Sequence, residues 1–205
     1  MKNLNSKVVV IISIILGLGL FAGLIYFIKA NQEPEEVTLP VVLEEFSDFQ
    51  CPACAAYFDI VNTVTSEFSE EELDFRYRHF PLTTIHEYAY NAAVASEAAR
   101  EQGKFKEYHD LLFQNQENLT DEDLLKYATD LGLDVEKFQQ DLNNAEVKAR
   151  VDNDMAEADS REYTSTPTFV INGKRITIST NPEEQLREAI QEKIDIAKSQ
   201  QQEGN

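Results

Sequence analysis

The sequence predicts an α/β domain that carries an inserted block of helices and follows a membrane-spanning helix. Three observations support this fold class. Short β-rich segments occur early in the chain and return only near its end, helical patterns fill the long stretch between them, and an uncharged apolar run stands at the amino terminus. With 205 residues, the chain is long enough for one well-buried domain.

The apolar run extends from Val8 to Ile28. It matches the roughly 20 residues that a membrane-spanning helix needs, whereas a cleavable signal peptide has an apolar region of only about 7–15 residues. We therefore expect residues 1–29 to form an uncleaved anchor. Lys2 and Lys7 favour a cytoplasmic amino terminus. The expected product is a single-pass membrane protein whose folded part lies outside the cytoplasm, on the periplasmic or cell-surface side.

Charge is distributed unevenly along the chain. There are 18 Lys and Arg against 37 Asp and Glu, giving a net charge of −19, and every acid follows the apolar run. Such a surface repels phosphate groups, so we expect no nucleic-acid partner. Residues 30–37 are polar and acidic, which predicts a linker, and residues 200–205 are expected to be a frayed tail.

Four segments have strand character. Leu39–Phe46 is rich in β-branched and large apolar residues and is too short for an ordinary helix, which predicts a central strand. Leu73–Phe80 alternates apolar and polar residues and predicts a second strand. Thr168–Ile171 and Arg175–Ser179 flank Asn172-Gly173, a strong signal for an antiparallel hairpin.

Helices account for most of the remainder. After Cys51-Pro52, apolar residues recur at spacings of three and four, which predicts a helix packed along one face. Residues 84–162 contain helical signals and no convincing strand, so we expect a helical insertion there. The α/β domain then comprises residues 38–83 and 163–199.

Some helix boundaries can be predicted from single residues. Thr120, with Asp123 three residues later, resembles a capping box. Residues 145–161 are polar and predict an exposed helix. Asn181 is expected to cap a final helix that has Pro182 at its first position.

The two cysteines of the chain, Cys51 and Cys54, stand where the first strand gives way to the following helix. Unpaired N–H groups and the positive dipole end at a helix N-terminus stabilise a thiolate, which lowers the pKa of Cys51 and makes it the nucleophile. Cys54 lies one turn further in and is placed to attack a mixed disulfide on Cys51, which releases the substrate. The pair predicts thiol-disulfide exchange.

Two other uses of the cysteine pair are less consistent with the sequence. A zinc site would need two more ligands, and the spacings of His79, His86 and His109 match no zinc finger or ribbon. A purely structural disulfide would close a very short loop and would constrain the unfolded chain little. We therefore expect no metal, and no cofactor beyond the redox-active disulfide itself.

The histidines are expected to be structural. His79 and His86 flank the end of the second strand, where we expect satisfied hydrogen bonds, and His109 is expected to lie on the surface of a helix.

The segment Glu45–Cys54 (EFSDFQCPAC) resembles the active-site strand and helix of DsbA-like thiol-disulfide oxidoreductases. Tyr77–Leu82 (YRHFPL) and Thr166–Gly173 (TPTFVING) are also similar to that family, especially to its membrane-anchored bacterial members. A CXXC pair alone is a weak signal, whereas CPXC after a strand together with a distant Thr-Pro before another strand is specific. The resemblance covers about residues 38–198 and implies a thioredoxin fold with an inserted helical domain.

The resemblance also implies roles for further residues. Thr166 and Pro167 would form the family's cis-proline loop, which lies against Cys51 and offers backbone groups to an extended substrate; an ordinary trans bond is the commoner state of X-Pro. Glu45 would be the buried acid that accepts or relays the proton of the resolving cysteine, since burial raises a carboxyl pKa. A slip of one residue in strand register would exchange Glu45 with its neighbour Glu44, which is otherwise expected to be solvated.

One departure from the family pattern affects the expected redox strength. Ala53 stands where the best-known oxidases carry a histidine, so one source of thiolate stabilisation is missing. Each pKa unit of lost stabilisation corresponds to about 30 mV in a two-electron couple, which predicts a milder oxidant.

The predicted function is that of a thiol-disulfide oxidoreductase that introduces disulfides into thiol-containing secreted or membrane proteins. For such an oxidase, the resemblance implies a membrane quinone-linked thiol oxidase as the redox partner. Two alternatives stay open: a disulfide reductase or isomerase of the same fold, and a non-enzymatic peptide-binding module or chaperone.

Overall fold

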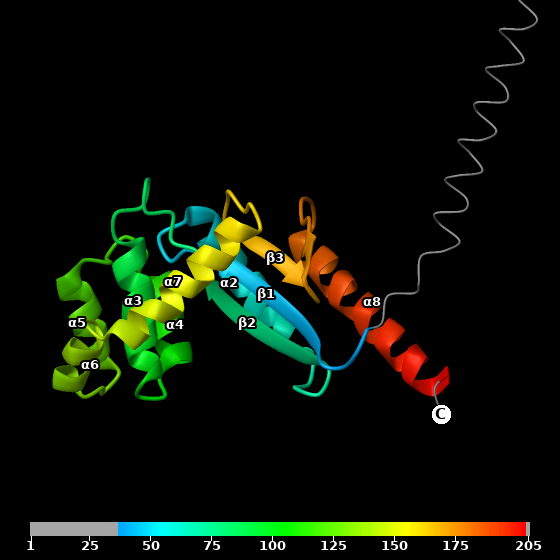
Figure 1. The fold of residues 1–205 in the computed structure, drawn as a ribbon, viewed down its shortest axis with the longest axis horizontal. Coiled ribbons are helices and arrows are strands. Elements are labelled where there is room, and N and C mark those ends of the chain that lie inside the picture. The colour runs from blue at the N-terminus through cyan, green and yellow to red at the C-terminus, as the bar shows by residue number, and fades with distance from the viewer. Residues whose placement is uncertain (1–36, 204–205) are drawn as a thin grey trace, which may run out of the picture. The chain divides into compact units, whose positions relative to one another are not determined.

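A computed structural model describes residues 37–203 and shows one four-stranded sheet flanked by helices (Figure 1). The elements are β1 (Val41–Ser47), α2 (Pro52–Thr65), β2 (Leu73–His79), α3 (Ala89–Arg100), α4 (Phe105–Gln114), α5 (Asp121–Asp130), α6 (Val135–Asp141), α7 (Ala145–Ser160), β3 (Thr168–Ile171), β4 (Lys174–Ile176) and α8 (Pro182–Glu203). The predicted order of a β-α-β unit, a block of helices and a β-β-α unit is confirmed.

The strands are arranged in the order β2-β1-β3-β4, so β1 lies inside the sheet, as predicted. β1 pairs in parallel with β2 and antiparallel with β3, and β3 pairs antiparallel with β4. The β3–β4 hairpin turns at Asn172 and Gly173, whose φ angles of 47° and 78° are the positive values that a tight two-residue turn requires.

Alternate residues of β1 face opposite sides of the sheet. Val41 and Leu43 pack with α2 and α8, in a cluster that includes Val61 and Ile190. Phe46 packs on the other side with Ala158 of α7 and with other apolar residues. Figure 1 shows α7 crossing one face of the sheet while α2 lies on the other. β1 therefore lies between two core layers, and its successive side chains point alternately into one layer and the other.

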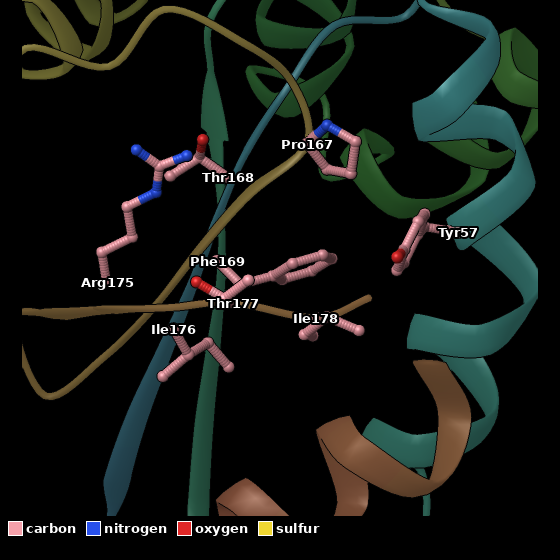
Figure 2. Close-up of a pocket in the computed structure, with 8 residues that line it drawn as sticks. All are labelled: Tyr57, Pro167, Thr168, Phe169, Arg175, Ile176, Thr177 and Ile178. Atoms are coloured by element: carbon pink, nitrogen blue, oxygen red, sulfur yellow. The ribbon is translucent and has the colours of Figure 1, made fainter. Parts of the chain in front are cut away.

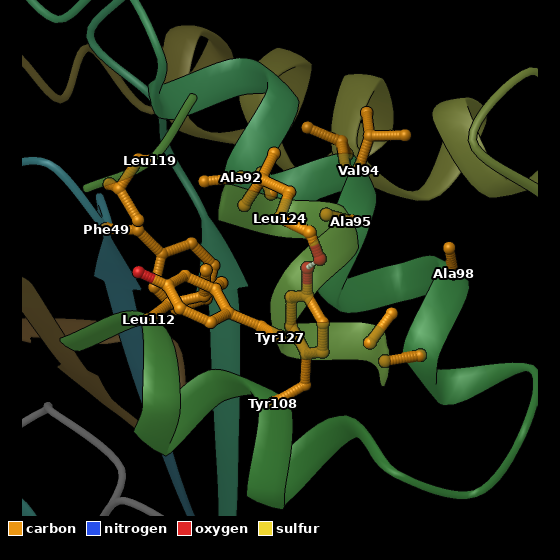
Figure 3. Close-up of a cluster of buried hydrophobic side chains, with 14 of the residues drawn as sticks. Phe49, Ala92, Val94, Ala95, Ala98, Tyr108, Leu112, Leu119, Leu124 and Tyr127 are labelled. Atoms are coloured by element: carbon orange, nitrogen blue, oxygen red, sulfur yellow. Dashed lines mark hydrogen bonds between the residues drawn. The ribbon is translucent and has the colours of Figure 1, made fainter. Parts of the chain in front are cut away.

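The helical block packs around α3, in which every residue from Ala92 to Ala99 is buried. Small alanine side chains allow neighbouring helices to approach closely. Figure 3 shows Tyr108 of α4 reaching across this core, where its hydroxyl donates a 2.7 Å hydrogen bond to the carbonyl oxygen of Leu124. The same cluster includes Cys51 and Cys54, so the inserted helices and the cysteine pair share one core.

Helix capping follows the sequence in one case and departs from it in another. Thr120 and Asp123 form the predicted reciprocal capping box at the start of α5. Asn181 is not an N-cap of the ordinary kind, because its φ of 53° is left-handed and its side-chain amide donates to Glu184 Oε2 at 2.6 Å. Asn181 nevertheless occupies the predicted position, because α8 begins at Pro182 and the N–H of Gln185 donates to the carbonyl oxygen of Asn181 at 3.0 Å.

Three further expectations need correction. The polar helix α7 is not simply exposed, because Val147, Val151 and Ala158 are buried. The predicted tail is helical as far as Glu203, because α8 continues to bury apolar side chains as late as Ile194 and Ala197. Val37, assigned to the linker, is buried, and its N–H donates to the Gln200 side chain at 2.9 Å.

The predicted anchor, Val8–Ile28, and nearly all of the predicted linker lie outside the described residues. Within residues 37–203, no helix is both long and apolar enough to cross a membrane.

Candidate active site

The cysteine pair occupies the start of α2. Cys51 directly precedes the helix in an extended conformation, and Pro52 follows at the first helical position, where its missing N–H has no intrahelical role. Cys51 is 7% exposed, whereas Cys54 is fully buried. Both residues are thiols in this structure. The cysteine that an incoming sulfur can reach is therefore Cys51.

The surroundings drive the pKa values of the two thiols in opposite directions. A hydrogen bond from the Cys54 thiol lowers the pKa of Cys51 to about 5, against the opposing effect of burial, and the backbone N–H groups of Cys54 and Ala53 contribute to the lowering. Burial raises the pKa of Cys54, and the neighbouring Cys51 and Glu45 raise it further. The thiolate is thus favoured at Cys51 and disfavoured at Cys54 without a histidine between them.

The segment before β3 lies against the nucleophile. The Thr166–Pro167 peptide bond is cis, and the Cys51 Sγ atom is 3.6 Å from the carbonyl oxygen of Thr166. The fold therefore brings together residues from the two parts of the α/β domain, on either side of the helical block.

Glu45 lies on the same face of β1 as Leu43, which is the face that α2 covers. It is 4% exposed, and burial raises the pKa of its carboxyl group to about 7. Its charge also raises the pKa of Cys54. The structure therefore brings Glu45 and Cys54 to one buried place.

The neighbouring Glu44 faces the opposite side of the sheet. Its carboxylate lies 3.6 Å from guanidinium nitrogens of both Arg78 and Arg161, and the residue is only 8% exposed. Glu44 is thus buried and ion-paired, rather than solvated as expected. The two glutamates have not exchanged places, because their alternation on β1 is fixed by the core on each side.

Three polar residues at the site were not singled out from the sequence. They hold residues 48–51, here named the nucleophile loop. Gln116 Nε2 donates to the carbonyl oxygens of Phe49 at 2.7 Å and Cys51 at 3.0 Å. Asp48 and Gln50 accept hydrogen bonds from backbone N–H groups that follow β2. Asp48 and Gln50 stand beside the CXXC pair, but Gln116 belongs to a distant loop and has no local sequence signal.

The histidines divide into two groups. His79 Nε2 lies 2.9 Å from Glu97 Oε1, and His86 Nδ1 lies 2.7 Å from Asp48 Oδ2, so each has a structural polar partner, as expected. His109 is buried rather than exposed. Its ring packs in the core among aromatic side chains, so the helical face that carries it was assigned wrongly. The rings around it are those of Phe49, Phe58, Tyr77, Phe105 and Phe113.

A small cavity of about 130 Å³ opens beside Pro167 (Figure 2). In Figure 2, Tyr57 of α2 approaches it from one side and Arg175 stands at the opposite end. Its lining is about equally polar and apolar and is uncharged apart from Arg175; it consists of Tyr57, Pro167, Thr168, Phe169, Arg175, Ile176, Thr177 and Ile178.

The three segments that surround Cys51 carry no Asp, Glu, Lys or Arg. They are Phe49–Phe58, Phe80–His86 and Tyr163–Gly173, here named the uncharged rim. Hydrogen bonds from Leu82 to Asp48 and from Cys51 to Thr166 connect them. Among residues 37–203, the large hydrophobic side chain that is exposed is that of Ile85, which is 71% exposed. Within residues 37–203, no group of three His, Cys, Asp or Glu side chains could hold a metal ion.

Comparison with known proteins agrees with this architecture. A family model described as Thioredoxin matches residues 38–192. A thioredoxin-like oxidoreductase from Silicibacter pomeroyi DSS-3 superimposes with a TM-score of 0.65 at 29% identity, covering 78% of this chain and 87% of that one. Oxidoreductase DsbA from Xylella fastidiosa has the same fold, with a TM-score of 0.65 at 20% identity and the same coverage of both chains.

The chain is also similar to one part of a longer protein. Na(+)/H(+) antiporter NhaA 3 of Salinispora tropica is 40% identical over 136 residues, which are 66% of this chain and 21% of that protein. The chain thus spans about a fifth of the length of the curated relatives it matches. The family match establishes that this chain belongs to the thioredoxin family, and its CXXC pair lies in a fold that it shares with DsbA structures.

Proposed function

We propose that the protein oxidises the thiols of extracytoplasmic proteins to disulfides. The observation that carries this direction is the stabilised thiolate of Cys51, whose pKa is lowered to about 5. A thiolate stabilised in the reduced protein favours reduction of the Cys51–Cys54 disulfide, so the disulfide is readily donated to a substrate. The stabilisation comes from Cys54, from Thr166 and from the first turn of α2, and it does not require a histidine at the position of Ala53.

In the proposed reaction, a substrate thiolate attacks Sγ of Cys51 in the oxidised protein. The Cys51–Cys54 bond breaks, a mixed disulfide forms at Cys51, and Cys54 leaves as a thiolate that takes up a proton. Glu45, with a pKa of about 7, supplies that proton from within the core. A second substrate thiolate then attacks the substrate sulfur, and Cys51 leaves as a thiolate. Two electrons pass from the substrate to the cysteine pair.

The proposed substrates are thiol-containing secreted or membrane proteins with little restriction on sequence. The uncharged rim supports this, because it offers no fixed charge that would select a substrate by electrostatic complementarity. Beside Cys51, the segment at Thr166 and Pro167 is proposed to bind the backbone of an extended substrate, which is common to all sequences. The cavity next to Pro167 then has room for an apolar side chain of the substrate.

The proposed location is the outer side of the membrane, with a membrane quinone-linked thiol oxidase restoring the disulfide. The support is the apolar run at residues 8–28 with its amino-terminal lysines. A membrane-impermeant maleimide added to intact cells should label Cys51 of the full chain after mild reduction. Labelling that occurs only after the cells are lysed would contradict this location.

The direction of exchange can be tested by equilibrating the full chain, in mild detergent, with glutathione buffers of known ratio. We expect a reduction potential more oxidising than about −180 mV, closer to the roughly −120 mV of strong oxidants than to the −270 mV typical of reductants. A value near −270 mV would instead assign the protein to the reductases or isomerases. The Cys51→Ser variant, which cannot form the disulfide, is the control for exchange at any other site.

A further inference from the structure

Asp48 is a buried acid that takes no part in the sulfur chemistry. Its side chain is fully buried, and both of its carboxylate oxygens accept hydrogen bonds. Oδ1 accepts from the backbone N–H of Gln50 at 2.7 Å. Oδ2 accepts from the backbone N–H of Leu82 at 2.8 Å and lies 2.7 Å from Nδ1 of His86. Because a carboxylate only accepts, His86 is satisfied here by placing its proton on Nδ1.

These contacts connect two separate segments of the chain. Gln50 belongs to the nucleophile loop, whereas Leu82 and His86 belong to the connection between β2 and α3. A second link runs parallel to the first, since Gln50 Oε1 accepts from the N–H of Tyr88 at 2.8 Å. The connection after β2 therefore supports the nucleophile loop from one side, through side chains of the loop itself.

We propose that Asp48 and His86 form a positioning pair that fixes the nucleophile loop against the connection after β2 and so sets the reactivity of Cys51. Asp48 acts on Cys51 through the loop backbone, because the N–H of Cys51 donates to the carbonyl oxygen of Asp48 at 3.1 Å. Neither side chain of the pair is required to exchange a proton or a sulfur bond. The inference holds for either direction of disulfide exchange.

The reason why position matters lies at the start of α2. The Cys51 thiolate is stabilised by the Cys54 thiol, by Thr166 and by the N–H groups of Cys54 and Ala53. All of these groups lie on α2 or just before β3, whereas Cys51 itself belongs to the nucleophile loop. A small displacement of the loop lengthens these contacts, and charge-assisted hydrogen bonds weaken steeply with distance and angle. Gln116 cannot replace the pair, because it holds the loop from another side and only through carbonyl oxygens.

The first test uses His86, which is 16% exposed in its side chain and can be replaced with less risk to folding than Asp48. His86→Ala removes the ring donor, whereas His86→Asn retains a donor near the position of Nδ1. We expect the pKa of Cys51, measured on the reduced full chain from thiolate absorbance and from the pH profile of iodoacetamide reaction, to rise by about half a unit in His86→Ala. The alkylation rate at pH 4.5 would then fall about threefold, and His86→Asn would restore most of it.

The second test removes the acceptor. Asp48→Asn leaves one side-chain oxygen to serve three donors, so we expect a larger rise in the pKa of Cys51 and a lower reduction potential. Asp141→Asn is the matched control, because Asp141 is a buried acid paired with Lys137 on α6, well away from Cys51. The control should leave both quantities unchanged.

If Cys51 of the folded His86→Ala variant titrates with the wild-type pKa, the proposal is overturned, whatever the result for Asp48→Asn. Equal effects of His86→Ala and His86→Asn would also overturn it, because the hydrogen bond would then be irrelevant. Unfolding curves measured alongside identify any general loss of stability. Thiolate titration needs neither a substrate nor a redox partner, so its outcome is independent of whether the protein donates disulfides.

Discussion

The thiol of Cys51 lies 3.6 Å from the carbonyl oxygen of Thr166, although 115 positions separate the two residues in the chain. The whole helical block is inserted between them. The block can be large without disturbing this contact, because β1 and β3 are directly paired in the sheet and hold both ends of the insertion. The site is therefore built by strand pairing, not by proximity in sequence.

Replacing the two cysteines should have different consequences. Cys51→Ser removes the accessible sulfur, so we expect no disulfide exchange at all. Cys54→Ser retains Cys51 but removes the internal sulfur, so we expect mixed disulfides with substrates to accumulate. Non-reducing electrophoresis after acid quenching measures both. Exchange at the wild-type rate in Cys51→Ser would contradict the assigned nucleophile.

The reactivity of Cys51 should follow its lowered pKa. Because only the thiolate is alkylated, the rate should rise around pH 5 and be level by pH 7, whereas a thiol at its ordinary value of 9.0 would still be rising at pH 8. In the reduced protein, the unfolded chain binds more protons between these values. This group therefore adds stability as pH rises from about 5 to 9, and that contribution is absent below 5. An alkylation midpoint above pH 8 would refute the prediction.

Glu45→Gln should stabilise the protein at alkaline pH. The folded state holds the carboxyl proton up to about pH 7, whereas an ordinary glutamate loses it near 4.5. Folding stability therefore falls as pH rises from 4.5 to 7, by about 3 kcal/mol at full effect, and the variant should lose this slope. The same variant should donate disulfides more slowly, because Cys54 loses its proton source. Urea unfolding from pH 4 to 8 and stopped-flow exchange measure the two effects.

Glu44→Gln is the matched control for Glu45. Its carboxylate balances Arg78 and Arg161 on the other face of the sheet. We expect this variant to lose about 1–3 kcal/mol of stability and to keep the pH slope between 4.5 and 7. If the slope disappeared here and remained in Glu45→Gln, the two roles would have to be exchanged.

Glu97 should be among the most costly acids to replace. Burial alone would raise the pKa of Glu97. Hydrogen bonds from His79 and Arg100 outweigh this effect and hold the pKa at about 2. Arg150 Nε donates to the same carboxylate at 2.7 Å. Glu97→Gln removes the negative charge that pairs with these donors. We therefore expect a loss of about 3–5 kcal/mol in the free energy of unfolding.

The control for Glu97 is Glu101→Gln, since Glu101 is exposed and shares the Arg150 side chain. Its replacement should cost less than about 1 kcal/mol. The contribution of Glu97 should be present at neutral pH and decline as pH falls from 4.5 towards 2. Equal losses in the two variants at pH 7 would show that burial of Glu97 adds nothing.

Periodicity and turn chemistry carried most of the fold prediction. The alternation in β2, the turn at Asn172-Gly173 and the capping box at Thr120 are local patterns, and each appears in the structure. Burial was less predictable, because it depends on what a helix meets. His109 stands on a polar-looking helix and yet lies in the aromatic core, since β2 and α2 cover that face.

The candidate site shows the same division. The positions of Cys51 and Glu45 follow from strand alternation and from the start of a helix. Gln116 and the connection after β2 support the site through backbone carbonyl and N–H groups, whose partners are set by loop geometry. Such contacts cannot be predicted from residue type and spacing in one sequence.

The position of β1 inside the sheet also determines how the molecule opens. Its amide groups are bonded in part to β2 and in part to β3, so exchange of the whole strand with deuterium requires both ladders to separate, close to global unfolding. β4 is a three-residue edge strand bonded only to β3, and its amides should exchange through local fraying. Glu45 therefore stands on the slowest-exchanging strand and Arg175 on the fastest, which leaves the cavity rim free to adapt while the acid beneath the cysteines stays fixed.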